Sequence, residues 1–335
     1  MTTEISPNHN GKPVLTATSG RSRLAGHFPP AVPPSGPPAS PPGSPKLPAL
    51  PPADGGYTPL GIQPRMLMPE LDYGFGTTGA KIVGTITDLA KAEFGRLPNA
   101  YNWLAIDGAA RETDIDREHF MGLDIDGCGT DPRKGYQRFM ESYFRIRYAV
   151  DQQVQRLSEY DPLIPVDNSP RDVLAVRIFA GCGGSSAGML HPMISLVHDV
   201  AQQRRIQKLR VYLVLMGADM PLRDSSRTVI REQKLAVPDN CANNLVRVFA
   251  DITSSAVIQE HRPDGSTFKV PAAERVWAPA VIDQSNGQHE WSTTNELVEM
   301  IASAYFLQIF TVAGKYVEER DNDNRRLGIM AHGTT

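Results

Sequence analysis

The sequence predicts an α/β fold, in which a mostly parallel sheet is covered by helices on both faces. From residue 66 onward, apolar runs of strand length alternate with runs of helical period, the order typical of parallel sheets. Glycine-rich loops follow several of the apolar runs and lead directly into helical runs, so these loops belong at the carboxyl ends of strands. Because such sheets bind ligands at this edge, the same observations predict where a functional site lies.

The individual elements follow from their periodicity. Strands are expected at 102–106, 173–180, 209–216 and 276–283, where apolar residues run almost continuously. Helices are expected at 80–94, 136–157, 189–203, 240–252 and 293–319, where apolar residues recur at helical spacing. Residues 66–73 make a poor strand, because Pro69, Glu70 and Asp72 interrupt the apolar pattern.

The first part of the chain has a different composition. Seventeen of the 28 prolines precede Glu70, and residues 28–52 are almost all Pro, Ala, Ser and Gly. Such a segment favours extended polyproline conformations and offers little apolar surface to bury. We therefore expect residues 1–65 to be a disordered, proline-rich tail. A spacer is the simplest role, and a ligand for a proline-recognising partner is the alternative.

Composition also excludes several classes of function. The formal net charge of −3 does not suggest a nucleic-acid-binding surface. No apolar run approaches the roughly 20 residues that span a bilayer, and the first residues lack the pattern of a signal peptide. These features favour a cytoplasmic protein.

The cysteines fit the same interpretation. Cys128, Cys182 and Cys241 form an odd, widely spaced set without metal-like pairing, and small buried side chains are their expected role. Cys128 and Cys182 lie in glycine loops, where backbone N–H groups lower the pKa of a thiol. We therefore expect weak redox sensitivity at these two positions.

Four loops carry the functional signal. The first is Gly74-Phe-Gly-Thr-Thr-Gly79, and the second follows the strand Trp103-Leu-Ala-Ile-Asp107. The third is Gly127-Cys-Gly-Thr-Asp-Pro-Arg-Lys-Gly135, and the fourth is Ala180-Gly-Cys-Gly-Gly-Ser-Ser-Ala-Gly-Met189. A glycine loop at a helix N-terminus presents N–H groups that favour phosphate. The sequence lacks the Gly-x-x-x-x-Gly-Lys-Ser/Thr pattern, so a P-loop nucleotidase is excluded.

In this order the four loops resemble those of the tubulin and FtsZ superfamily, particularly its divergent bacterial tubulin-like branch. The resemblance covers about residues 66–320 and implies a Rossmann-like, tubulin/FtsZ-type GTPase domain that binds GTP. Mg²⁺ would be held mainly by phosphate oxygens and water, since no carboxylate cage is evident. Asn243 or Asn244 would read the base. The residues that the resemblance places at the nucleotide are Gly74, Gly76, Thr77, Thr78, Gly79, Asp107, Ala109, Gly127, Gly129, Thr130, Gly181, Gly183, Gly184, Ser185, Ser186, Asn243 and Asn244.

The resemblance also divides the chain after the tail. It implies a nucleotide-binding domain at 66–292, a central long helix at 293–320 and a flexible C-terminal tail at 321–335. Family members continue with an acidic loop that completes the site of the next subunit in a filament. Asp321 and Asp323 lie near that place, but their context fits a solvated helix end better. We therefore expect slow or undetectable GTP hydrolysis by this chain alone.

The fourth loop departs from the family pattern. Ser185, Ser186 and Ala187 stand where the family has mainly Gly and Thr. Their Cβ atoms are expected to restrict the positive φ angles that such loops often use. Two roles stay open: a nucleotide-dependent partner of a full-length tubulin-like filament or of a second copy, and a degenerate scaffold whose tail recruits partners.

Two other classes of enzyme also remain open. Gly184-Ser-Ser-Ala-Gly188 satisfies the Gly-x-Ser-x-Gly elbow of α/β-hydrolases, with Ser186 as nucleophile, Asp219 or Asp283 as acid and His289 as base. A nicotinamide-dependent oxidoreductase would use the first loop together with Asp107 on the ribose.

Overall fold

The computed structural model describes residues 6–7, 13–14, 64–109, 118–124, 131–162, 164–217, 231–282, 291 and 293–314. The chain divides into two units, Met1–Leu50 and Pro51–Thr335. In the first unit, the short strand β1 (Ser6–Pro7) pairs antiparallel with β2 (Pro13–Val14). Almost all of the proline-rich tail lies outside the described residues, so its disorder stays a prediction, as does the proposed division of the chain.

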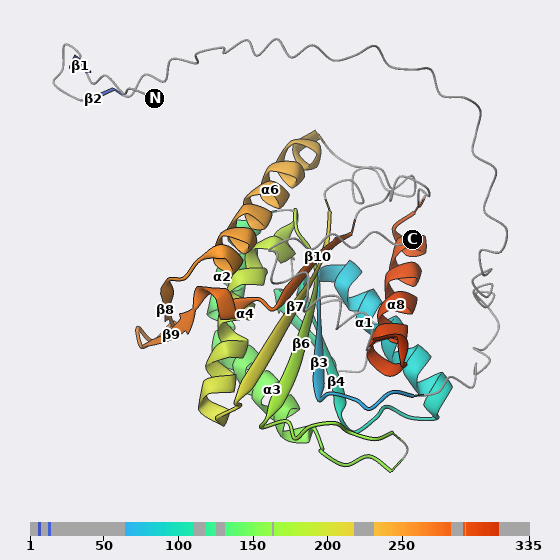
Figure 1. The fold of residues 1–335 in the computed structure, drawn as a ribbon. Coiled ribbons are helices and arrows are strands. Elements are labelled where there is room, and N and C mark those ends of the chain that lie inside the picture. Colours follow the sequence, from blue (N-terminus) through green and yellow to red (C-terminus); the bar gives the residue numbers. More distant parts are fainter. Residues whose placement is uncertain are drawn as a thin grey trace, which may run out of the picture. The chain divides into compact units, whose positions relative to one another are not determined.

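The second unit contains the predicted parallel sheet (Figure 1). Within the described residues it has six strands, all paired in parallel, in the spatial order β10-β7-β6-β3-β4-β5. If the six strands are renumbered 1 to 6 along the chain, the same order read from the β5 end is 3-2-1-4-5-6. This is the strand order of doubly wound nucleotide-binding folds. The strands are β3 (Glu70–Phe75), β4 (Tyr101–Ala109), β5 (Phe120–Asp124), β6 (Val173–Gly181), β7 (Lys208–Met216) and β10 (Ala278–Ile282).

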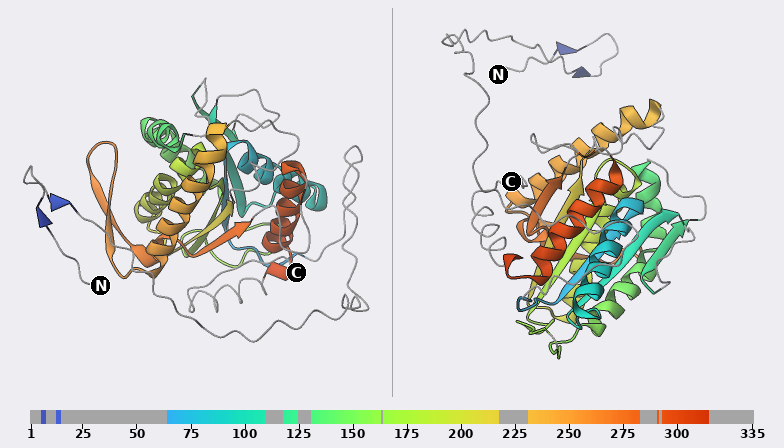
Figure 2. Two further views of the ribbon diagram at one scale, coloured as in Figure 1. Left: turned by 90° about the horizontal axis from the view of Figure 1, so that it is seen from above. Right: turned by 90° about the vertical axis from the view of Figure 1, so that its right-hand side faces the viewer.

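Helices cover both faces of this sheet, as Figures 1 and 2 show. One face carries α1 (Gly76–Phe94) and α8 (Thr294–Phe310), which pack against each other. The other face carries α2 (Pro132–Glu141), α3 (Tyr143–Arg156), α4 (Ser185–Arg204) and α6 (Arg231–Thr253). A hairpin of β8 (Val257–His261) and β9 (Thr267–Pro271) follows α6 and leads into the short helix α7 (Ala272–Arg275). No helix in the described ranges is both long enough and apolar enough to cross a membrane.

Two apolar cores explain why the strands read as continuous apolar runs. Alternate strand residues, such as Leu104 and Ile178, pack under α3 and α4. Their neighbours, such as Ala105 and Phe179, pack under α1 and α8. Because strand side chains alternate between faces, a sheet covered on both sides needs apolar residues at successive positions.

The expectation of a poor strand at 66–73 is wrong, because Glu70–Phe75 forms the central strand β3. Its two acidic side chains are buried with partners. Arg177 of the neighbouring strand forms an ion pair with Glu70, and the Tyr101 hydroxyl donates to Asp72 Oδ2 at 2.9 Å. Burial, followed by the charge of Glu70, raises the pKa of Asp72 well above its usual value. Polar residues in this strand are therefore tolerated through pairing.

Several helix boundaries also differ from expectation. The helix predicted at 136–157 is two helices, α2 and α3, which separate at Ser142. The helix predicted at 293–319 ends at Phe310, where Thr311 turns extended and its hydroxyl donates to the Leu307 carbonyl at 2.6 Å. Helix α6 begins at Arg231, nine residues before the predicted start at Asn240. The hairpin β8–β9 and strand β5 were not predicted from periodicity.

Candidate functional site

The strand order places one topological switch point in the sheet, between β3 and β6. These two strands are parallel neighbours, yet the chain leaves β3 toward β4 on one side and leaves β6 toward β7 on the other. The loops that follow such a pair diverge, and the crevice between them is where doubly wound sheets bind ligands. The first and fourth predicted loops follow β3 and β6, so the fold brings them to this crevice.

Both loops end in a helix whose N-terminus lacks a side-chain cap. Helix α1 starts after Phe75 and helix α4 starts after Gly184, and among the described residues no side chain caps either start. The first N–H groups of each helix therefore have no partner within the helix, and the helix dipoles add positive potential. A Cβ built on Gly76 would lie 3.9 Å from the Ser186 Cβ, so the two helix starts adjoin.

The glycines of the first loop have different roles. A Cβ on Gly74 would overlap the Gly79 carbonyl, and a Cβ on Gly79 would overlap the Phe179 carbonyl. These two glycines allow α1 to begin against β6, which is a packing role. Gly76 has φ +67°, a conformation that glycine adopts without strain. Thr78 is half-buried in the first turn of α1.

The second loop is tied to the first by a side-chain contact. Asp107, near the end of β4, is 9 % exposed and accepts a hydrogen bond from Thr77 Oγ1 at 3.3 Å. Ala109 is the last residue of β4 and pairs with Asp124 of β5. The structure thus brings Thr77 and Asp107 together at the carboxyl edge, as predicted for neighbouring nucleotide loops.

The expected strain in the fourth loop is not present. Ser185, Ser186 and Ala187 form the first turn of α4, and among the described residues the positive φ angles outside glycine are confined to Arg205. Side chains at these three positions therefore cost no backbone strain, and the expectation that they restrict the loop is wrong. The Ser186 hydroxyl donates to the Gly181 carbonyl at 2.8 Å and closes the turn.

Within the fourth loop, Gly183 and Gly184 differ in their surroundings. A Cβ on Gly183 would lie 2.6 Å from the Val237 carbonyl oxygen, so this glycine lets α6 pack against the loop. A Cβ on Gly184 would meet no atom of the described residues within 4 Å, so within that part of the chain this position is open. Gly181 ends β6, and its carbonyl holds Ser186 as described.

Gly127, Gly129 and Thr130 of the third loop lie outside the described residues, and so does Cys128. The end of that motif is described and has a packing role. A Cβ on Gly135 of α2 would overlap the Ser185 carbonyl, so this glycine permits α2 to cross closely over the start of α4.

Helix α6 is tied to the fourth loop by Asn240 and by Asn244, the second of which was predicted to read the base. Asn244 Nδ2 donates to the Cys182 carbonyl at 3.2 Å, and Asn240 Nδ2 donates to the Gly183 carbonyl at 3.0 Å. Asn243 is exposed beside them. The base-reading role of Asn243 and Asn244 stays a prediction.

A disulfide joins Cys182 of the loop to Cys241 of α6. The interpretation of these two cysteines as separate buried side chains is therefore wrong. This pairing could not be predicted from local sequence patterns, because 59 positions separate the two residues.

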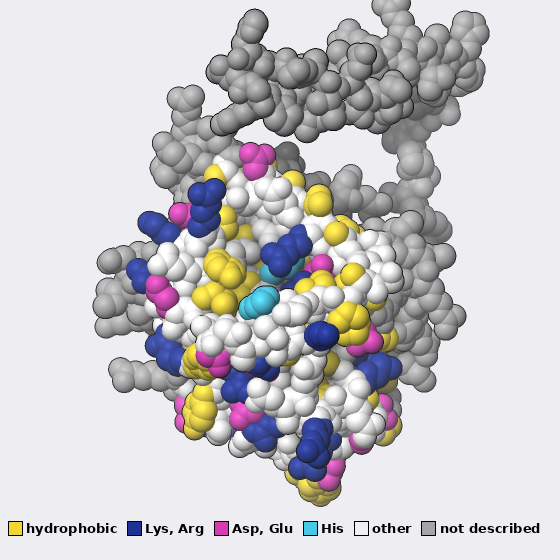
Figure 3. Space-filling view, turned by 90° about the vertical axis from the view of Figure 1, so that its left-hand side faces the viewer, with side chains coloured by type: hydrophobic (Ala, Val, Ile, Leu, Met, Phe, Trp, Pro, Cys, Tyr) yellow, Lys and Arg dark blue, Asp and Glu magenta, His cyan; other side chains and the backbone are white. Residues whose placement is uncertain are grey.

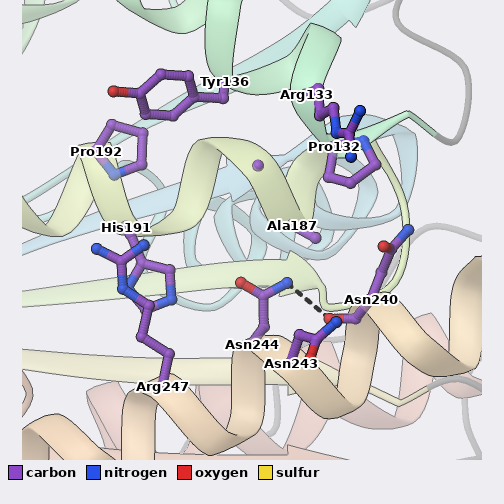
Figure 4. A pocket seen from close by; sticks show the side chains of 11 residues that line it. Pro132, Arg133, Tyr136, Ala187, His191, Pro192, Asn240, Asn243, Asn244 and Arg247 are labelled. Atoms are coloured by element: carbon purple, nitrogen blue, oxygen red, sulfur yellow. Dashed lines mark hydrogen bonds between the residues drawn. The ribbon is translucent and has the colours of Figure 1, made fainter. Parts of the chain in front are cut away.

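A pocket of about 370 Å³ lies between α2, α4 and α6, next to the fourth loop (Figure 4). Its polar lining includes Arg133 of α2, His191 of α4, and Asn243, Asn244 and Arg247 of α6. Sequence analysis missed His191 and Arg247, because helical periodicity alone does not distinguish a buried polar residue from a surface one.

The described residues do not assemble a hydrolase triad. Ser186 lies in the first turn of α4 with its hydroxyl donated to Gly181. Asp219, Asp283 and His289, its predicted partners, lie outside the described residues, and so do Asp321 and Asp323.

Comparisons with known proteins add little to this description. No family model matches the chain, and no curated protein matches it. Among solved structures, the chain is similar to Clostridium botulinum phage c-st TubZ, a protein truncated at its C-terminal tail, with 13 % identity and a TM-score of 0.40. The match covers 70 % of this chain and 58 % of the TubZ chain, so it spans less than two thirds of that structure. The fold assignment rests on the strand order and layers described above.

Proposed function

We propose that the crevice between β3 and β6 binds a nucleoside triphosphate through its phosphates. One observation carries the proposal: two helices with uncapped N-termini, α1 and α4, start side by side at the switch point of a doubly wound sheet. Backbone N–H groups of two helices converging on one crevice provide a site for a polyphosphate anion.

The residues around this crevice suit that ligand. The N–H groups at Gly76, Thr77 and Thr78 and those at Gly184 and Ser185 would face the phosphates, since they start the two helices. Asp107, held beside Thr77, would orient water on a phosphate-bound Mg²⁺. Gly74, Gly79 and Gly183 support the backbone by close packing and would not touch the ligand.

Guanine as the base follows from the sequence resemblance to tubulin-like proteins, and so does self-association into filaments. The proposed ligand is therefore GTP with Mg²⁺, and the proposed role is a nucleotide switch in a self-associating or filament-bound protein. Sedimentation of the full chain with and without GTP tests the second part, and a nucleotide-independent sedimentation profile would contradict it.

Calorimetric titration of the full chain with GTP and ATP, each with Mg²⁺, tests the first part. The decisive variants are Gly184→Asp and Gly184→Asn. Both side chains have the same shape, and the Gly184 Cβ position has no neighbour within 4 Å among the described residues, so both variants should fold. Only Gly184→Asp adds a negative charge at the phosphates.

The site is supported if wild type and Gly184→Asn bind GTP and Gly184→Asp binds at least about tenfold more weakly, the size of one like-charge contact. The proposal fails if wild type binds neither nucleotide. It also fails if the charged and neutral variants bind equally well, because the anion then lies elsewhere.

A further inference from the structure

The pocket between α2, α4 and α6 is separate from the crevice between β3 and β6. It reaches Ala187 in the first turn of α4, but includes none of the helix-start positions proposed for the phosphates. On the face of the molecule that Figure 3 shows, basic and histidine side chains lie beside a group of hydrophobic side chains near the centre. The pocket is lined by side chains of the same three kinds: basic, histidine and hydrophobic.

His191 is the first sign that the pocket holds a ligand. It is 5 % exposed, and within the described part of the chain neither ring nitrogen makes a hydrogen bond of good geometry, although the Asn244 side chain lies near enough to raise the pKa of the ring slightly. Burial first, then the charges of Arg247 and Arg275, lower the pKa of His191 to about 3. The ring is therefore neutral at physiological pH and offers one donor and one acceptor. Buried polar atoms in native proteins rarely stay unpaired, so a further partner for this ring, beyond the described residues, is expected.

Arg247 is the second sign. Figure 4 shows its guanidinium beside the His191 ring at the pocket wall. Within the described residues no hydrogen bond or ion pair holds it, and the nearby carboxylates of Asp251 and Glu260 are paired with Arg275 at 2.6 and 2.9 Å. Arg247 is an exposed residue. Partial desolvation and the charge of Arg275 lower the pKa of its guanidinium, while the charges of Asp251 and Glu260 partly offset this effect. An anion in the pocket would relieve this repulsion.

The remaining lining residues indicate the charge, polarity and size of the ligand that the pocket accepts. Arg133 supplies a second guanidinium from α2, and none of the described residues that line the pocket is acidic. Tyr136 and Pro192 form an apolar wall opposite the asparagines, as Figure 4 shows. The volume, about 370 Å³, is at the lower end for small-molecule sites.

We propose that this pocket binds a small organic oxyanion that carries hydroxyl groups, with the anion on Arg247 and Arg133 and a hydroxyl on His191. Guanidinium groups recognise phosphate and carboxylate through paired hydrogen bonds. A neutral imidazole pairs with a hydroxyl as donor and acceptor. The inference does not depend on nucleotide binding at the crevice.

Histidine-labelled full-length protein allows the test by NMR at pH 7. The probes are glycerol 3-phosphate and malate, with glycerol as the uncharged comparison. The variant His191→Asn identifies the His191 signal. We expect at least one of the two anions, and not glycerol, to shift this signal with saturation, and the two anions distinguish a phosphate ester from a carboxylate.

Arg247→Gln keeps the length of the side chain and removes its charge, and should weaken that binding at least about tenfold. Arg145→Gln removes an exposed charge from α3 outside the pocket and should leave it unchanged. Gly184→Asp should also leave it unchanged, which separates this site from the crevice. The His191 signal itself reports whether each variant is folded.

Three results would overturn the proposal. One is that neither anion shifts the His191 signal at millimolar concentration. Another is that Gly184→Asp abolishes anion binding while Arg247→Gln does not, since the anion then occupies the helix starts. The third is that guanosine shifts His191 and the anions do not, which would make the pocket part of a nucleoside site.

Discussion

The substitution Gly188→Ala tests whether close helix crossing explains the last glycine of the fourth loop. A Cβ on Gly188 of α4 would overlap the Pro132 carbonyl oxygen and lie 2.9 Å from the Tyr136 nitrogen of α2. Both obstacles are backbone atoms, so a side-chain rotation cannot relieve the contact. Overpacking of this kind costs about 1–3 kcal/mol, and a backbone obstacle places the cost near 3 kcal/mol.

The matched control is Gly84→Ala, in the interior of α1. A Cβ at Gly84 meets no atom of the described residues within 4 Å, so this variant gains helix propensity without a packing penalty. The gain from Gly to Ala in a helix is about 1 kcal/mol and applies to both variants. Gly84→Ala should therefore stabilise by about 1 kcal/mol, and Gly188→Ala should destabilise by about 2 kcal/mol.

Guanidinium unfolding of the full chain measures both free energies. The difference of about 3 kcal/mol corresponds to melting temperatures roughly 6–12 °C apart for a domain of this size. Equal stabilities for Gly188→Ala and Gly84→Ala would refute the reasoning, because α2 and α4 would then not cross as closely as the structure shows.

Two further predictions concern buried polar and covalent pairs. Asp72→Asn should gain stability relative to wild type as the pH rises from 5 to 8. Burial and the charge of Glu70 raise the pKa of Asp72 in the folded chain. At pH values where Asp72 is ionised only in the unfolded chain, the unfolding free energy of wild type falls by up to about 1.4 kcal/mol per pH unit. An equal difference in unfolding free energy between the variant and wild type at both pH values would contradict this. Removal of the Cys182–Cys241 disulfide by Cys241→Ala should destabilise the oxidised protein by about 4 kcal/mol, which is the loop-closure value for a separation of 59 residues. Cys128→Ala is the control. Wild type in reductant should have the same unfolding midpoint as Cys241→Ala.

Much of the fold could be predicted because strands that are buried on both faces of a sheet appear in the sequence as continuous apolar runs. The apolar runs of β4, β6 and β7 and the helical periods between them need no tertiary information. The central strand β3 was missed for the opposite reason. Its acidic residues depend on Arg177 and Tyr101, which lie far along the chain, so the sequence pattern does not show that their burial is compensated.

The position of the candidate site could also be predicted, but the roles of its residues could not. A glycine loop after a strand indicates the carboxyl edge whatever each glycine does. Whether a glycine faces a ligand or a neighbouring helix depends on contacts across the fold. Gly135, for example, permits the close approach of α2 to Ser185. The hydrogen bonds from Asn240 and Asn244 to the loop could not be predicted for the same reason, because they join segments about 60 positions apart.

The distinction between packing glycines and open glycines changes what a substitution can reveal about this protein. Loss of binding in a variant of Gly74, Gly79 or Gly183 would follow equally from a displaced helix, because each supports close backbone contact. Gly184 is different, since its Cβ position is free and its backbone angles suit other residues. A change of charge there alters the crevice without moving α4. The proposed phosphate recognition is therefore tested most directly at Gly184, and variants of the other glycines report on the packing that positions the loops.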